Sequence, residues 1–237
     1  MKLFKRLTIN GEIIPLVSED IRLQLNTPGR ASFVVSKPVE RGVISFDIGY
    51  KKETIYRYFY GYIESVTKID EEHYSIFCQE FGAVLNRRIT TNIQHVTLKD
   101  VVQELAKQTA LKFIVPDKPY SKTLTACFYS TGGGYHCMDS LEDIFSIDQY
   151  VWQQQTDGKI FVGSWDDSRW KDRTVAIADK WLVKHGVGNS ATMPIVPTLR
   201  PGVEISGRGL ITKTAFKNDS INLSWSDKFW KKPLKSW

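Results

Sequence analysis

The sequence predicts a mainly β fold with a small α+β insertion, in which two antiparallel β-barrel domains flank the insertion. Closely spaced alternating strands, with Gly, Pro and Asn between them, fill the first part of the chain. Helical periodicity enters after Thr97, and alternating strands return after Arg173. We therefore expect a first barrel over residues 1–94, an inserted α/β unit over 95–168, and a second barrel with a tail over 169–237.

The first region contains strong turn and strand signals. Asn10-Gly11 separates two short apolar runs, which is the strongest local signal for a β-hairpin. Residues 21–25 alternate apolar and polar, as a half-buried strand does. The Pro-Gly pair within residues 27–30 predicts a turn. Strands at this spacing favour a small barrel or sandwich.

An aromatic-rich strand follows in the same region. Strict alternation would place Tyr56, Tyr58, Tyr60 and Tyr62 on one face and Phe59 on the other. Four tyrosines on one face suit base stacking, a protein interface, or ordinary cross-strand packing. The sequence leaves these three interpretations open.

The middle of the chain changes character. Apolar residues at helical spacing predict a helix over 98–110, with Thr97 as its N-cap and Asp100 near the positive end of the helix dipole. A second helical stretch follows the triple glycine at 132–134, and two strands meet around Asp157-Gly158, a favoured tight turn. These elements predict a small α/β unit.

The last region is again β-rich. Alternating or β-branched runs predict strands at 174–177, 181–184, 203–207, 210–217 and 220–225. Asn218-Asp219 predicts the turn between the last two of these runs. This pattern favours a second antiparallel barrel or half-barrel.

The chain is basic, with net charge +6 and a pI near 9.1, which permits an anionic partner without requiring one. Four lysines and four large apolar residues share the last ten positions, an ending that suits either solvent exposure or docking on a neighbour. Docking is slightly favoured. The candidate partner-interface residues are Tyr58, Tyr60, Tyr62, Phe229, Trp230 and Trp237.

Targeting and cysteine patterns are sparse. No apolar run approaches the roughly 20 residues that span a bilayer, and no apolar stretch of signal-peptide type follows the basic start, so we expect assembly in a cytoplasm. Three cysteines do not form a disulfide framework. Cys78 lies in an alternating segment and is expected in the core.

Motifs of catalysis are missing from the sequence. The four histidines are His73, His95, His136 and His185. None has an HExxH spacing, and zinc shared by Cys127, His136 and Cys137 lacks a supporting CxxC pair. Residues 132–134 lack the Lys and Ser/Thr of a P-loop, and the adjacent carboxylates lie in turn-like contexts. We expect no enzyme activity, no metal and no cofactor.

The order of three stretches resembles the baseplate hub proteins of tailed phages and the amino-terminal part of type VI secretion spike proteins. The first is residues 59–66 with the return strand ending at Cys78-Gln79-Glu80. The second runs from residues 96–105 through the triple glycine to residues 157–163, and the third is residues 197–203. Each stretch alone is a weak signature, and the resemblance rests on the order of all three along the chain.

This resemblance implies two tail-tube-like barrels per chain and a homotrimer with six quasi-equivalent positions. Such a ring would adapt a sixfold tail tube, or distal tail protein, to a threefold tip or fibre complex. Its lumen would pass DNA or a tape-measure protein. The chain is short for a contractile-tail hub and carries no lysozyme or spike part, so a compact hub is expected and the tail type stays open. The implied location is the virion tail.

Two other functions fit part of the pattern. A single-stranded nucleic-acid-binding protein with an OB-type barrel would use the basic balance and the tyrosine strand. A carbohydrate-binding module would use exposed, coplanar rings of Trp152, Trp165 and Trp170. Neither assigns a role to every region of the chain.

Overall fold

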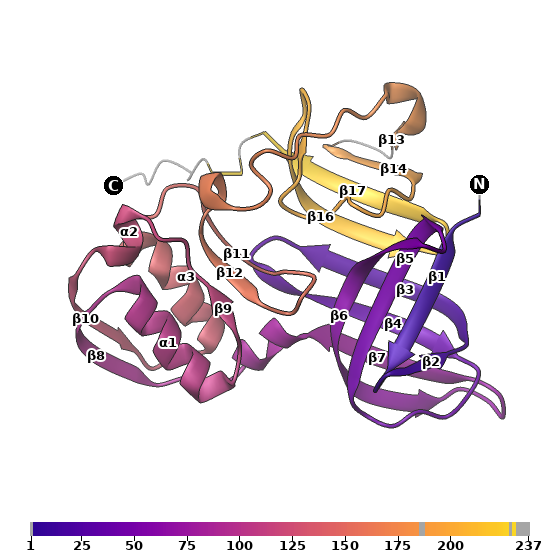
Figure 1. The fold of residues 1–237 in the computed structure, drawn as a ribbon, viewed down its shortest axis with the longest axis horizontal. Coiled ribbons are helices and arrows are strands. Elements are labelled where there is room, and N and C mark those ends of the chain that lie inside the picture. Colours follow the sequence, from indigo (N-terminus) through magenta and orange to yellow (C-terminus); the bar gives the residue numbers. More distant parts are fainter. Residues whose placement is uncertain (1, 185–187, 228, 231–237) are drawn as a thin grey trace.

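The computed structural model describes residues 2–184, 188–227 and 229–230. Figure 1 shows an α/β unit beside a larger, strongly curved β-sheet to which both ends of the sequence contribute. The mainly β class with a small α/β insertion is confirmed.

The first β-rich region forms seven strands and a short 3-10 helix. They are β1 (Phe4–Ile9), β2 (Glu12–Ile14), β3 (Leu16–Gln24), β4 (Thr27–Val35), β5 (Val43–Lys51), β6 (Thr54–Lys68), β7 (Tyr74–Glu80) and η1 (Phe81–Leu85). The β1–β2 hairpin turns at Asn10-Gly11, both with positive φ (48° and 88°), as a two-residue hairpin turn requires. This hairpin prediction is confirmed.

The inserted unit contains three helices and small sheets. Its elements are β8 (Thr91–Val96), α1 (Leu98–Thr109), β9 (Phe113–Ile114), α2 (Pro119–Lys122), β10 (Thr125–Ser130), α3 (Gly134–Ile144), β11 (Tyr150–Gln154), β12 (Ile160–Ser164) and η2 (Trp165–Asp167). The predicted helix 98–110, the second helical stretch and the Asp157-Gly158 hairpin are confirmed. The sequence did not predict α2, β8 or β10.

The last region contributes η3 (Asp179–Trp181), β13 (Val183–Lys184), β14 (Ser190–Pro194), β15 (Glu204–Ile205), β16 (Gly209–Lys217) and β17 (Ser220–Ser226). Strands β16 and β17 turn at Asn218, as predicted. Residues 174–177 form only an isolated bridge, from Val175 to Ile205, in place of the predicted strand.

One antiparallel sheet joins the two β-rich regions. Its strand order is β13-β14-β17-β16-β3-β4-β7-β6-β5-β1-β2, and β15 pairs with β16. The seam is the β3–β16 ladder, in which Leu23 lies opposite Thr214. The sheet curls back until Lys5 on β1 bonds Glu19 on β3, with 2.8 Å between Nζ and Oε1. Two separate closed barrels are not confirmed, since the described strands form one continuous sheet and no closed barrel.

A turn lies two residues earlier than the sequence suggested. The chain reverses at Leu25-Asn26, where Asn26 has a φ of 56°, while Pro28 and Gly29 lie inside β4. Gly29 is needed for close approach and not for a turn. A Cβ on Gly29 would lie 2.4 Å from Leu23 Cδ2 and 2.9 Å from Glu80 Cδ.

Two hydrophobic cores stabilise the fold. The core of the large sheet gathers alternate residues of both β-rich regions, such as Phe33, Phe46 and Phe216, which are fully buried. The core of the α/β unit packs α1 and α3 over its small sheets, with Leu105 and Leu141 fully buried. Cys78 is buried in the sheet core, as predicted.

Candidate functional site

The outer face of the large sheet carries polar and basic side chains across its strands. Successive strand pairings align one row across seven strands: Thr192, Asn222, Ala215, Arg22, Arg30, Gln79 and Tyr62. Their chain neighbours, such as Ile21, point into the core because side chains alternate between the two faces of a strand. The seam between β3 and β16 therefore lies within one polar surface.

A groove of about 520 Å³ follows this surface over the seam. Arg22, Arg30 and Lys213 line it together with amide and hydroxyl side chains, and Tyr135 of α3 borders it. None of the described residues that line the groove is an aspartate or glutamate. We call this surface the polar groove. It can attract phosphate or carboxylate groups over a wide area.

One carboxylate lies beside the polar groove. Asp20 accepts two hydrogen bonds from Arg22, at 3.0 and 3.1 Å, and the Arg22 guanidinium lowers the pKa of Asp20. Arg30 and Lys213 form no ion pair with the described residues. The groove therefore keeps a net positive charge after the Asp20–Arg22 pair is discounted.

A buried polar cluster holds the two β-rich regions together beneath the sheet. Arg200 donates from Nη2 to Glu80 Oε1 at 3.3 Å and from Nη1 to the Tyr58 carbonyl oxygen. Glu80 Oε2 accepts the Gly29 N–H at 2.7 Å, and the Tyr58 hydroxyl lies 3.2 Å from Thr214 Oγ1. Burial raises the pKa of Glu80, although Arg200 and the Gly29 N–H oppose that rise. The cluster connects β4, β6, β7 and β16 through a residue of the 195–203 loop.

The predicted face of four tyrosines does not exist. A β-bulge at Tyr58, between the pairs Asp47–Arg57 and Phe46–Phe59, reverses the alternation of β6. Tyr58 and Phe59 are both fully buried, while Tyr56 is 47% exposed. The extra residue in the bulge is the physical reason that the period-two prediction was wrong, and Tyr58 is not on the surface of the chain.

The other two candidate tyrosines pack within the chain. Tyr60 lies edge-on to Phe81 with ring centroids 5.0 Å apart, and Tyr62 stacks on the same ring at 6.4 Å. Gln154 Nε2 donates to the Tyr60 carbonyl oxygen at 2.7 Å. Both tyrosine side chains are half-buried, and they connect β6 to η1 and the α/β unit. Their role in a partner interface stays a prediction.

The candidate residues near the end of the chain are partly described. Phe229 and Trp230 pack edge to face at 4.5 Å and contact the core of the large sheet. Trp237 lies outside the described residues, as do Lys228, Lys231, Lys232 and Lys235. Docking of this segment on a partner also stays a prediction.

The structure places the three tryptophans and Cys137 in the interior, and Cys127 and His136 on the surface. Trp152, Trp165 and Trp170 are 2%, 9% and 2% exposed, so their rings cannot form the exposed platform that a carbohydrate module needs. Cys137 is buried and its thiol contacts Ser130 Oγ at 3.0 Å, whereas Cys127 is exposed. No group of three His, Cys, Asp or Glu within the described parts of the chain is arranged to hold a metal ion. His185 lies outside them.

No helix in the described part of the chain is long and apolar enough to cross a membrane. Sequence reasoning did not find the polar groove, because Lys213 on β16 joins Arg22 and Arg30 on β3 and β4 only through the seam. The available signal was the alternation around Arg22, which placed that side chain on the polar face of a strand.

Comparisons with known proteins place this fold among tail proteins. No family model matches the chain. A 58.7 kDa uncharacterized protein of Haemophilus phage HP1 is 31% identical over 228 residues, an alignment that covers 94% of this chain and 42% of the phage protein. The chain thus spans less than half the length of the curated relative that it matches.

Solved structures resemble the chain over nearly its whole length. The 43 kDa tail protein of prophage MuSo2 from Shewanella oneidensis has a TM-score of 0.70 at 12% identity, covering 94% of this chain and 98% of that one. A tail protein from Neisseria meningitidis has a TM-score of 0.65 at 13% identity, covering 97% and 98%. An Escherichia coli type VI secretion component, described as similar to the T4 tail proteins gp27 and gp5, scores 0.63 at 13% identity, covering 96% and 79%.

These likenesses show a shared fold. The chain has the fold of phage tail proteins and of a type VI secretion component, as the resemblance in the sequence implied. At these identities, the role of the chain remains to be argued from its own surfaces.

Proposed function

We propose that the chain is a structural, non-enzymatic subunit of a phage tail, acting as a baseplate hub in the virion. In this proposal three copies form a ring that adapts a sixfold tail tube to a threefold tip or fibre complex. The carrying observation is the continuous sheet that joins both β-rich regions and presents one polar, basic face. The fold shared with tail proteins over nearly the whole chain adds support.

The polar groove supports the proposal that this face lines the lumen. A channel wall should bind neither DNA nor a tape-measure protein through apolar patches, because such contacts would hold the passing chain. The row from Asn222 to Gln79 holds amide and guanidinium groups, with Ala215 as its single small apolar residue. Arg22, Arg30 and Lys213 would attract the phosphates of DNA without reading base sequence.

The ends of the sheet support ring formation. Ile13 (66% exposed) and Val17 (53%) lie near the β2 end, beside a cavity of about 420 Å³ between β1, β2 and β3. Trp181 (50%) and Val183 (62%) lie at the β13 end. Two different apolar edges on one chain favour a head-to-tail contact. Such a contact gives a closed ring when the rotation between neighbouring copies is a whole fraction of a turn, as the proposed threefold ring requires.

Negative-stain electron microscopy of the purified chain at high concentration tests this proposal. Threefold rings with an open centre are expected for the unaltered chain. Ile13→Lys or Val183→Lys should abolish them, because each places a charge in the apolar contact between subunits. Leu124→Lys is the matched control, since Leu124 is 63% exposed on the α/β unit. Single particles under all conditions, including added tail-tube or tip protein, would contradict the proposal.

Single-stranded nucleic-acid binding is the second candidate, and the basic polar groove favours it. The row of exposed tyrosines that suggested nucleic-acid binding is absent, because Tyr58 is buried and Tyr60 and Tyr62 pack on Phe81. A nucleic-acid module would bind single-stranded DNA with an affinity that falls steeply as the salt concentration rises. The double variant Arg30→Gln with Lys213→Gln would remove about two phosphate contacts, so its log affinity would fall less steeply with log salt concentration. Tight binding of this kind, without rings, would favour this candidate over the hub.

A further inference from the structure

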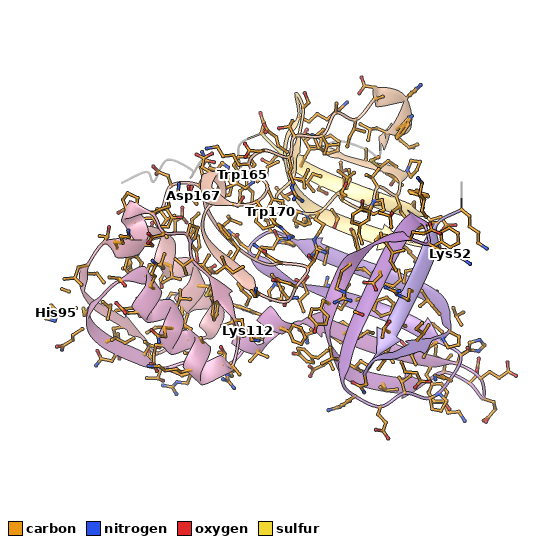
Figure 2. The ribbon with its side chains drawn as sticks, in the orientation of Figure 1. Lys52, His95, Lys112, Trp165, Asp167 and Trp170 are labelled. Carbon is orange, nitrogen blue, oxygen red and sulfur yellow. The ribbon has the colours of Figure 1, made fainter. Side chains whose placement is uncertain are left out.

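A second, smaller cavity lies away from the polar groove. It encloses about 140 Å³ where the segment after β12 meets β6 and the 197–203 loop. Figure 2 shows Trp170, which forms part of its wall, at the junction between the α/β unit and strands β16 and β17. Four arginines line the cavity, and none of the described lining residues is acidic: Arg57, Arg169, Arg173 and Arg200.

Two of these arginines have buried donors without acceptors. The Nε–H groups of Arg169 and Arg200 are inaccessible to solvent and lack a hydrogen-bond partner within the described chain. Arg200 is only 5% exposed. Arg169 donates no hydrogen bond to the described residues, and its guanidinium lies 5.2 Å from the Trp170 ring. Buried donors of charged groups are normally satisfied, so these two indicate a missing acceptor.

Arg57 and Arg200 have carboxylate partners, whereas Arg169 and Arg173 form no ion pair with the described residues. Burial, followed by repulsion from Arg200 and Arg173, lowers the pKa of Arg169 to about 10. Asp157 opposes this shift, but it already bonds Lys159, with 3.2 Å between Oδ2 and Nζ. The pKa of Arg169 is therefore lowered mainly because its guanidinium is buried, and further because two other arginines lie near it.

The two carboxylates that pair with arginines of the cavity, Asp47 and Glu80, each have a second partner. Asp47 is shared between Arg57, at 3.0 Å, and Arg6, at 2.9 Å. Glu80 accepts from Arg200 and from the Gly29 N–H. Neither carboxylate can also neutralise Arg169 and Arg173, so the cavity retains a deficit of negative charge.

We propose that this cavity is an oxyanion site, and that its occupant in the assembly is the carboxylate of an acidic side chain on a partner polypeptide. A guanidinium fork matches a carboxylate in plane and spacing. Four such side chains line this cavity, and none of its described lining residues is acidic. We call it the arginine cavity.

A carboxylate on a polypeptide fits better than a nucleic acid. The cavity is too small for a sugar with its phosphate, and part of its wall is apolar, from Pro197, Val203 and the Trp170 ring. Such a wall suits the methylene stem of a glutamate. Tyr56, 47% exposed at the cavity, and the arginines are of the types that dominate protein interfaces. The cavity belongs to one chain, so the inference rests on the proposed hub only for the identity of the partner.

Thermal unfolding of the full chain in the presence of small probes tests the site. The probes are acetyl-Ala-Glu-Ala-amide, its glutamine counterpart and inorganic phosphate, at matched ionic strength. The glutamate peptide should raise the melting temperature saturably, with an affinity at least tenfold above that of the glutamine peptide. Arg169→Gln should weaken this binding at least tenfold, while Arg41→Gln, which removes the same charge from an exposed loop position, should leave it unchanged.

The unliganded variant provides a second readout that a structural arginine would not give. Removing a buried, repelled and unbonded cation should stabilise the empty chain, so Arg169→Gln should melt about 2–4 °C higher without any probe. If Arg169 merely supported the fold, the variant would have a lower melting temperature than the unaltered chain. Higher stability together with lost glutamate binding is the result that identifies a binding site.

Three outcomes would overturn the inference. Equal binding of the glutamate and glutamine peptides would show no carboxylate recognition. Equal losses of affinity for the glutamate peptide in Arg169→Gln and Arg41→Gln would show only an effect of net charge. Saturable binding of phosphate, or of an oligothymidylate, without binding of the glutamate peptide would assign the cavity to phosphoryl groups. None of these results depends on ring formation, so failure of the site and failure of the hub are separable.

Discussion

The core of the α/β unit draws all of its buried side chains from one stretch of chain, from Leu85 to Val162. The core of the large sheet instead combines residues from Leu7 to Cys78 with residues from Val151 to Trp225. The first core can form from contacts that are local in sequence, whereas the second requires both ends of the chain to meet. This difference explains why the seam between β3 and β16 matters: it completes the larger core and the polar face together.

The largest expected effect concerns Arg200, which joins the 195–203 loop to β6 and β7. Arg200→Met should lower the free energy of unfolding by about 3–5 kcal/mol, because it leaves Glu80 buried without its cation. Burial already raises the pKa of Glu80, and the loss should be smaller at low pH, where Glu80 can bind a proton. Urea unfolding at pH 7 and near pH 4 measures both quantities.

The double variant Arg200→Met with Glu80→Gln is the control for this prediction. It removes the unpaired charge and should recover most of the stability. A double variant as unstable as Arg200→Met would mean that packing of the Arg200 stem, and not the ion pair, stabilises the seam.

Matched truncations in the two cores are the next test. Phe216→Ala removes a buried ring that contacts Phe46 and Tyr58, at centroid distances of 5.7 and 5.3 Å, and should cost about 3–5 kcal/mol. Leu141→Ala in the α/β core should cost about 2–5 kcal/mol. If the cores unfold separately, each variant shifts one of two urea transitions, followed by helical circular dichroism and by tryptophan fluorescence. A single shared transition in both variants would show that the two cores form one cooperative unit.

The features that could be predicted from the sequence are those that depend on residues close together in the chain. The hairpin at Asn10-Gly11 and the helix after Thr97 depend on neighbouring residues alone, and both are present. The bulge at Tyr58 could not be predicted, since the tyrosines alternate perfectly through it, and the contact that the Tyr58 hydroxyl makes with Thr214 on β16 is distant in sequence. Gly29 resembled a turn residue, but its lack of a side chain serves the approach of Glu80.

The candidate surfaces were unpredictable for the same reason. Arg22 and Lys213 are far apart in sequence and share the polar groove only through the seam. Arg169 lies in a segment without a recognisable motif, and the resemblance of residues 197–203 to hub proteins assigned no role to Arg200. Their common cavity depends on how the α/β unit sits on the sheet. The alternation of a strand assigned each side chain to one of its two faces. It could not predict which strands and which parts of the chain pack together.

A smaller effect is expected where the two regions touch. Gln154 donates to the Tyr60 carbonyl oxygen at 2.7 Å and accepts the Gly82 N–H at 3.2 Å. Gln154→Ala leaves both backbone groups without these partners and should cost about 1–3 kcal/mol. If this contact couples the cores, the two unfolding transitions should separate further in the variant. An unchanged separation would assign the coupling to other contacts, such as the bond from the Trp152 N–H to Asn26 Oδ1 at 3.0 Å.

The smallest expected effect is confined to the start of α1. Thr97 donates from its N–H and its hydroxyl to Asp100 Oδ2, at 2.9 and 2.7 Å, and accepts the Asp100 N–H. Thr97→Ala should therefore cost about 1 kcal/mol, seen only in the transition of the α/β core. The Thr97 hydroxyl, followed by its N–H, lowers the pKa of Asp100 in the folded chain.

A carboxyl whose pKa is lowered by folding stabilises the fold above its unfolded pKa, which is about 3.9 for aspartate, and this contribution disappears as the pH falls through the folded pKa. The stability difference between the unaltered chain and Asp100→Asn should therefore be present at pH 7 and shrink below about pH 4. Urea titrations of both chains across this range measure it. A constant difference would mean that the cap acts through geometry alone, and a change in the transition of the sheet core would show that the start of α1 is coupled to the seam.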